Sequence, residues 1–183
     1  MRFLEIHRGR LFSNGAAFSV AACHKGPELP GNYLSAHFCR GVSPLGSDGW
    51  RTPAPSPLSV AAAMDDFVNV VNRSWESNDP VFLATYVLWR LNNIHPFING
   101  NGRTARAACY YVLCLKLGGW PDGTVILPEL IKRDRDEYCV ALQAAHDAFA
   151  HTGEPDLKHL HEIVSRLLNE QLASAAPATE PVA

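Results

Sequence analysis

Two apolar segments joined by a short glycine-rich one occupy the middle of the chain, and they restrict the fold more than any other feature. Residues 81–94 are apolar around almost the whole circumference of a helix, which indicates a helix that runs through the protein interior. Asp79 and Pro80 favour a helix start, because the Asp side chain accepts the first free backbone N–H groups and Pro suits the first helical position. Pro96 disfavours helical backbone at His95, so this helix is predicted to end there.

Helical spacing of apolar residues recurs on both sides of this segment. A second buried helix is predicted over residues 104–117, because Gly118 and Gly119 follow it and glycine commonly ends helices. Three- and four-residue spacings predict further helices, one of them with a break near Asp134, over residues 60–75, 128–150 and 156–172. With 47% hydrophobic and 19% charged residues in 183, the chain can bury one sizeable core.

The predicted fold class is therefore all-α, with one insertion of another kind. Residues 37–57 are rich in Gly, Pro and Ser, a pattern that favours a small β-hairpin or extended flap over a helix. The predicted organisation is an N-terminal segment at 1–36, the flap at 37–57, a helical core at 58–172 and a disordered tail at 173–183.

The segment from His95 to Arg106, between the two central helices, has the composition of a phosphate-binding loop. Gly100 and Gly102 permit positive φ, so the backbone can fold into a concave nest of inward-pointing N–H groups. The nest leads into a helix N-terminus, whose free N–H groups and dipole favour an anion. Arg103 and Arg106 share one face beside the nest. Two guanidiniums there oppose the helix dipole, which indicates an anionic ligand and predicts a polyphosphate site.

His95 begins this loop and is the candidate catalytic base. Its ordinary pKa lies close to neutral, so it can accept a proton near physiological pH. A base beside a phosphate site indicates activation of a hydroxyl for attack on phosphorus. Two simpler interpretations exist, because repeated Asn-Gly pairs are also typical of tight hairpin turns and a lone His at a helix end commonly caps or packs. The turn interpretation leaves His95 and the two arginines unexplained.

With these residues in place, the chain resembles the Fic/Doc family, whose signature is His-Pro-Phe-x-Asp/Glu-Gly-Asn-Gly-Arg-x-x-Arg. The resemblance extends over roughly residues 38–172, and it includes the flap and the helix that follows the motif, here Arg135–Leu142. It implies a Fic-type helical domain with a small β-hairpin flap. The identical motif positions keep the spacing intact, and they are His95, Pro96, Phe97, Gly100, Asn101, Gly102, Arg103 and Arg106.

The resemblance implies a protein nucleotidyltransferase that moves AMP from ATP onto a Ser, Thr or Tyr hydroxyl of a target protein. In that picture His95 takes the hydroxyl proton, Asn101 and its two neighbouring glycines hold the α-phosphate region, and the two arginines hold the β- and γ-phosphates. The flap holds an extended segment of the target by strand addition. A phosphotransferase of the Doc kind is the alternative on the same fold, although that branch departs from Gly-Asn-Gly-Arg within the loop.

Asn99 departs from the family pattern, because relatives usually carry an acid there that binds Mg²⁺ on the nucleotide phosphates. An amide offers oxygen without negative charge, so Mg²⁺ is expected to bind more weakly, with Asn99 as the candidate metal ligand. Three outcomes stay open, and the first is favoured: catalysis with a weakly or differently held metal, a different transfer reaction, or a nucleotide-binding module with weak or no catalysis.

Partners and location are expected from features outside the loop. Many relatives carry an inhibitory Ser/Thr-x-x-x-Glu-Gly/Asn helix, but no Glu of this chain follows Ser or Thr by four residues. A separate antitoxin-like inhibitor is therefore expected, or no inhibition. A net charge of −2 argues against a nucleic-acid partner. The chain shows no signal-peptide pattern and no apolar run of the ~20 residues that span a bilayer. Its five cysteines form no Cys-x-x-Cys pair and are expected to be free thiols in a reducing compartment, so a cytoplasmic protein is expected.

Two clusters of titratable residues near the C-terminus are interpreted as surface. The spacing of the histidines does not match the i, i+4 pair of a helical zinc site, so a solvated helix face is predicted for His146, His151, His159 and His161. The cations at 132, 133 and 135 alternate with acids, which is typical of a salt-bridged exposed face.

Overall fold

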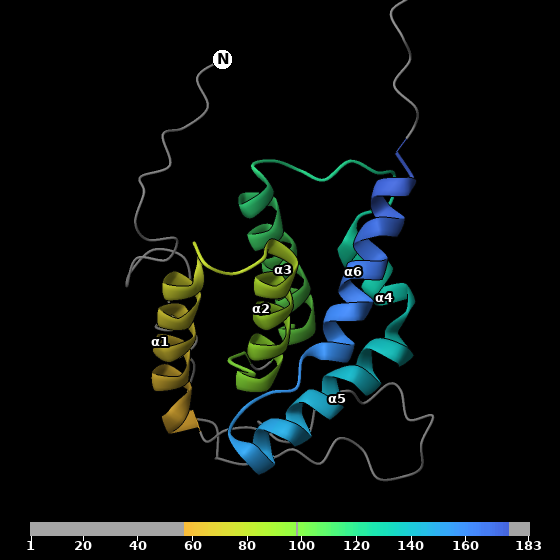
Figure 1. Cartoon of the computed structure of the whole chain (residues 1–183). Coiled ribbons are helices and arrows are strands. Elements are labelled where there is room, and N and C mark those ends of the chain that lie inside the picture. Colours follow the sequence, from red (N-terminus) through yellow and green to blue (C-terminus); the bar gives the residue numbers. More distant parts are fainter. Residues whose placement is uncertain (1–56, 98, 176–183) are drawn as a thin grey trace, which may run out of the picture.

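The computed structural model describes residues 57–97 and 99–175, which form six helices and no strand (Figure 1). The all-α prediction is confirmed for these residues. The predicted flap lies outside the described residues except for Pro57, which begins a helix, and the division of the chain into segments stays a prediction. The helices are α1 (Pro57–Ser74), α2 (Pro80–Ile94), α3 (Asn101–Leu117), α4 (Leu127–Arg133), α5 (Arg135–Thr152) and α6 (Lys158–Ala173).

The central helix α2 begins and ends where the sequence predicts. The Asp79 carboxylate accepts hydrogen bonds from the backbone N–H groups of Val81 and Phe82, at 2.9 and 3.0 Å, and Pro80 is the first helical residue. At the other end, His95 leaves the helical conformation with φ 53° and ψ 54° and donates its backbone N–H to Leu91 O at 3.1 Å. The proline that follows His95 disfavours right-handed helical backbone at this position, in agreement with the end of α2.

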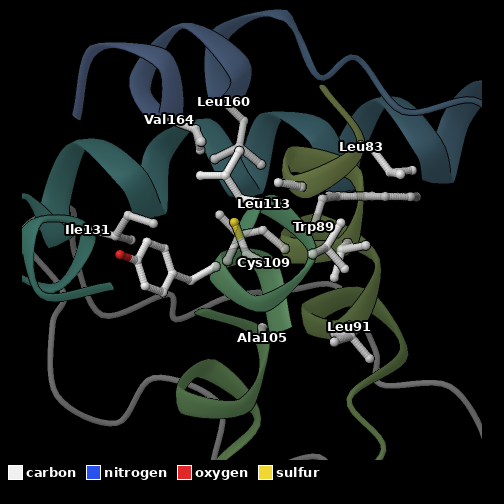
Figure 2. Packing of buried hydrophobic residues seen from close by; sticks show 14 of the residues in the cluster. Leu83, Trp89, Leu91, Ala105, Cys109, Leu113, Ile131, Leu160 and Val164 are labelled. Atoms are coloured by element: carbon white, nitrogen blue, oxygen red, sulfur yellow. The ribbon is translucent and has the colours of Figure 1, made fainter. Parts of the chain in front are cut away.

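Helices α2 and α3 lie side by side at the centre of the molecule, and the others cover them (Figure 1). Helix α2 buries side chains over most of its circumference, while the strip of Phe82, Tyr86, Arg90 and Asn93 stays at least partly exposed. Figure 2 shows how α2, α3, α4 and α6 each contribute apolar side chains to one cluster. Full burial of one Leu or Ile side chain contributes about 1.5–3 kcal/mol, so this cluster stabilises the α2–α3 pair and the loop between them. Labelled members include Leu83, Trp89, Cys109, Leu113, Ile131 and Leu160.

The other helices depart from the predicted bounds by a few residues. Helix α3 begins at Asn101, three residues before the predicted start, so Arg103 lies in its first turn and Arg106 in its second. It ends at Gly118, which takes the left-handed conformation (φ 76°), and Gly119 donates its N–H to Cys114 O at 2.9 Å. The predicted break near Asp134 is confirmed, because it separates α4 from α5. None of the described helices is both long and apolar enough to cross a membrane.

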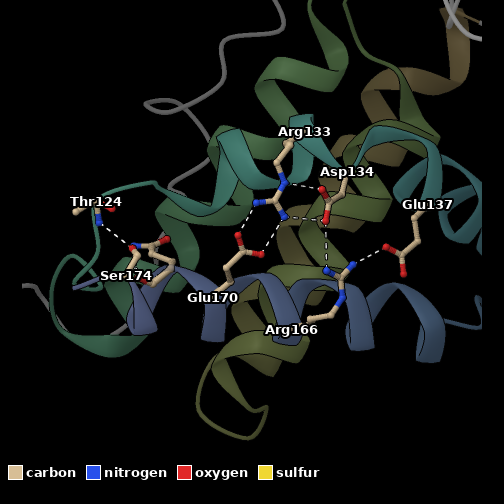
Figure 3. A network of polar contacts seen from close by, with 8 residues as sticks. Thr124, Arg133, Asp134, Glu137, Arg166, Glu170 and Ser174 are labelled. Carbon is tan, nitrogen blue, oxygen red and sulfur yellow. Dashed lines mark hydrogen bonds and ion pairs between the residues drawn. The ribbon is translucent and has the colours of Figure 1, made fainter. Parts of the chain in front are cut away.

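A network of ion pairs holds the α4–α5 corner onto α6 (Figure 3). Asp134, at the break, contacts Arg133 at 2.6 Å and Arg166 of α6 at 3.2 Å. Arg133 also pairs with Glu170, and Arg166 with Glu137. A single exposed ion pair contributes about 0–1 kcal/mol. These pairs share partners, so together they hold the α4–α5 corner in one orientation against α6. The guanidiniums lower the pKa of the Asp134 carboxyl, with Arg133 the larger cause.

The segment between α3 and α4 is tied to α6 by Gln171, whose side chain is fully buried. Its amide N–H₂ donates to Tyr110 Oη at 3.0 Å and to Pro121 O at 2.8 Å. Its amide oxygen accepts from the Leu127 N–H at 2.7 Å. One side chain thereby joins α3, the connecting segment and the start of α4.

Candidate active site

A pocket of about 640 Å³ lies between the loop after α2, the start of α3 and the α4–α5 corner. This volume falls in the range of small-molecule sites. Every site residue predicted from the sequence lines it, so the fold brings all of them together: His95, Asn99, Gly100, Asn101, Gly102, Arg103 and Arg106.

The loop enters α3 through a residue in the left-handed conformation. Gly100 has φ 84° and precedes the first residue of the helix, and its carbonyl accepts the Thr104 N–H at 2.9 Å. Gly102 permits positive φ but does not adopt it, because α3 already includes this residue. The N–H groups in the first turn of a helix have no carbonyl partner one turn earlier, so they supply the donors that the predicted nest requires.

The two glycines also make room for the two arginines. A Cβ atom on Gly100 would lie 3.4 Å from Arg103 Nη2, and one on Gly102 would lie 3.5 Å from Arg106 Nη1. Both guanidiniums therefore lie against the loop backbone. These are ordinary van der Waals distances, so at Gly100 it is the positive φ that favours glycine.

Asn101 holds the loop closed. Its side chain is 4% exposed, its Oδ1 accepts the Phe97 N–H at 2.9 Å, and its Nδ2 donates to Phe97 O at 2.6 Å. Both polar ends of the amide are therefore occupied within the loop. The sequence interpretation assigned Asn101 to the α-phosphate region, whereas the geometry gives its side chain a positioning role and leaves its backbone N–H at the helix start.

His95 occupies a strained position at the edge of the pocket. A non-glycine residue in the left-handed conformation costs about 1–2 kcal/mol, and among the described non-glycine residues only His95 adopts positive φ. Burial lowers the pKa of the imidazole below its ordinary 6.5, while a hydrogen bond with the Asn92 backbone raises it by a smaller amount. The ring is therefore neutral near pH 7, which is the form that accepts a proton.

A chain of polar contacts fixes the last turn of α2, directly before His95. Arg90 contacts Asp66 of α1 at 3.4 Å and donates to Asn93 Oδ1 at 2.9 Å. Because a guanidinium can only donate, the Asn93 amide turns its N–H₂ group toward His146 Nδ1, at 3.3 Å. His146 must then accept at Nδ1 and stay neutral, and burial lowers its pKa to about 4. The predicted solvated face is wrong for His146, which is 3% exposed.

Seven lining residues were not predicted, and most come from the α4–α5 corner. Asn92, in the last turn of α2, donates to Leu88 O at 2.7 Å and to Tyr138 Oη at 3.0 Å, and the second bond joins α2 to α5 beside the pocket. The predicted salt-bridged exposed face at the corner is correct for Arg133 and Lys132, which pair with Glu170 and Glu129, although Lys132 and Arg135 also line the pocket. The complete set is Asn92, Ile131, Lys132, Arg135, Tyr138, Cys139 and Leu142.

The residues that line the pocket do not suit a divalent cation. Mg²⁺ prefers several oxygen ligands, with carboxylates prominent among them, whereas the described lining residues include no Asp or Glu. Four of them carry positive charge, and Asn99 offers only an amide. Nowhere in the described part of the chain are three or more His, Cys, Asp or Glu residues grouped to hold a metal ion.

The chain matches the family model of the Fic/DOC family over residues 2–113, more than half of its 183 residues, and it belongs to that family. It is also similar to proteins named protein adenylyltransferase Fic. The protein of Drosophila persimilis is 36% identical over 94 residues, which cover 51% of this chain and 17% of the relative. That of Drosophila grimshawi is 37% identical over 95 residues, which cover 51% and 18%. The chain thus spans less than a fifth of the length of these relatives.

Proposed function

We propose that this chain transfers AMP from ATP to a Ser, Thr or Tyr hydroxyl of another protein. The observation that carries the proposal is the meeting, in one pocket, of a neutral His95 with the arginines at the start of α3. A base beside an anion site of this size suits attack by a hydroxyl on a nucleotide phosphate. The family and the adenylyltransferase names of its relatives support the same reaction.

The proposed step begins with the target hydroxyl beside the His95 imidazole. As the hydroxyl oxygen bonds to the α-phosphorus, His95 accepts its proton and the bond from the α-phosphorus to the β-phosphate oxygen breaks. Pyrophosphate leaves with the electron pair. Arg103 and Arg106 stabilise the negative charge on the leaving group, and the free N–H groups at the start of α3 stabilise the charge at the α-phosphate. Positioning and charge supply most of the catalysis for such transfers.

The partners and the location extend this proposal. The segment 37–57 holds the target as an added strand, and a separate small antitoxin-like protein inhibits the enzyme in the cytoplasm. Asn99 favours a second candidate, a module that binds nucleotide without turnover, because it lacks the charge of the family's acid. A transfer of the γ-phosphate, as in the Doc branch, remains the third candidate.

The test uses ATP labelled at the α- or the γ-phosphate, with the chain itself and a cell lysate as acceptors. We expect label from the α-phosphate with the wild type and none with His95→Ala, while His151→Ala, at an exposed histidine outside the pocket, transfers like the wild type. The rate should fall as the pH drops through the lowered pKa of His95, below 6.5. Label from the γ-phosphate would replace AMP transfer by phosphorylation, and ATP binding without any transfer would favour the module.

A further inference from the structure

The pocket carries positive charge from two separate parts of the chain. Arg103 and Arg106 come from the start of α3, and Lys132 and Arg135 come from the two sides of the α4–α5 break. The described lining residues carry no acid that would offset these charges. The second pair belongs to no part of the loop motif, so the loop alone does not explain it.

The charged side chains of the α4–α5 corner lie on two sides, one that contacts α6 and one that lines the pocket. Its inner residues, Arg133 and Asp134, are engaged by α6 through the ion pairs of Figure 3. The flanking residues Lys132 and Arg135 line the pocket instead. Lys132 also contacts Glu129 at 3.3 Å, but both side chains of this pair are more than half exposed. Such a pair contributes about 0–1 kcal/mol, so a phosphate can compete for the ammonium group.

These four charges match the charge of a nucleoside triphosphate. Its phosphates carry about four negative charges near pH 7 when the terminal group is ionised. A bound divalent cation would normally neutralise half of that charge. The described residues that line this pocket include no carboxylate ligand for such a cation. Guanidinium and ammonium groups form charge-assisted hydrogen bonds to phosphate and can supply the same neutralisation.

We propose that the pocket binds a nucleoside triphosphate without a divalent cation, with Lys132 and Arg135 neutralising the phosphate charge that the family resemblance assigns to Mg²⁺. This inference rests on the proposed function only for the identity of the ligand. It concerns binding, so it can be measured separately from transfer.

The experiment measures ATP binding by calorimetry, once with excess EDTA and once with Mg²⁺. For the wild type we expect dissociation constants within about threefold of each other in the two conditions. In EDTA, Lys132→Gln and Arg135→Gln should each weaken binding about tenfold, since each removes a charged partner of the phosphates. Lys158→Gln, at an exposed lysine outside the pocket, is the matched control and should bind like the wild type. Thermal unfolding confirms that each variant is folded.

Each alternative result has one meaning. Binding that EDTA abolishes and Mg²⁺ restores would overturn the inference and leave the proposed transfer standing. The same holds if the two pocket variants bind in EDTA as Lys158→Gln does. Metal-free binding that depends on Lys132 and Arg135, without transfer of α-label, would support the inference and refute the transfer. If ATP binds in neither condition, both proposals fail.

Discussion

Replacement of Asn101 by Ala separates the positioning role that the structure gives this residue from a direct contact with nucleotide. The variant removes two hydrogen bonds and leaves the N–H and C=O of Phe97 without their partner. An unsatisfied buried group costs about 1–3 kcal/mol, and because Phe97 is only partly buried, water can replace part of each bond. The lower end of that range applies to both groups, so we expect a loss of about 2 kcal/mol in the free energy of unfolding.

For a folded region of this size, that loss lowers Tm by roughly 5–10 °C. We expect ATP affinity to fall as well, because a loop that shifts by about 1 Å misplaces the donors at the start of α3. Urea unfolding measures the first effect and ATP titration the second. Ala107→Ser, at an exposed position on the same helix, is the control: it should cost only about 0.5 kcal/mol through helix propensity and should leave ATP affinity unchanged.

The reasoning fails if Asn101→Ala unfolds at the wild-type temperature yet no longer binds ATP. That result would return Asn101 to the role predicted from the sequence, a contact with the α-phosphate. A variant that is destabilised but binds ATP with full affinity would also contradict it, because the loop conformation would then not depend on the two bonds to Phe97.

Three further perturbations test the fold around the site. Asp79→Ala should lower the free energy of unfolding, measured with urea, by about 1 kcal/mol through loss of the α2 cap. Glu76→Ala, nearby and exposed, is the control and should change it by less than about 0.5 kcal/mol. His146 has a pKa of about 4 when folded and about 6.5 when unfolded, so the unfolded state binds more protons between these values. Stability should therefore fall by about 3 kcal/mol as pH drops from 6.5 to 4, and Tm measured across this range should show less of that fall in His146→Gln. A Cβ on Gly123 would lie 2.2 Å from Gln171 O, so Gly123→Ala should lower the free energy of unfolding by about 2 kcal/mol or more. Thermal unfolding measures this loss, and an unchanged Tm would contradict the close approach of the two backbones.

The helices were predictable because their determinants are local. Asp79 and Pro80 cap α2 through atoms within three residues, and Gly118 ends α3 through its own backbone conformation. The start of α3 was predicted three residues late, because Asn101 and Gly102 favour turns when judged alone. Packing of α3 against α2 overrides that preference, and Gly102 becomes helical.

The roles of two polar residues depended on partners that the sequence does not place nearby. Asn99 and Asn101 are the same residue type, each beside Gly100, so the sequence does not distinguish them. In the structure, Asn101 is buried against Phe97 and Asn99 is exposed in the pocket. His146 lies 53 residues from its partner Asn93, so only the packing of α5 on α2 shows that it is buried and neutral. Spacing along the chain carries no information about such contacts.

The position of Lys132 and Arg135 at the pocket, in contrast, is visible in their spacing along the sequence, although the net charge of the segment does not show it. Arg135, Cys139 and Leu142 line the pocket at intervals of four and three residues, which is one face of α5, and Lys132 lines it from the end of α4, three residues before Arg135. Alternation of acids and bases averages the segment to near neutrality, but neutrality of a segment does not imply neutrality of each face. The acids Asp134 and Glu137 lie on the side that contacts α6. The cations Lys132 and Arg135 lie on the side that lines the pocket, so the charges of such a segment should be summed separately for each side.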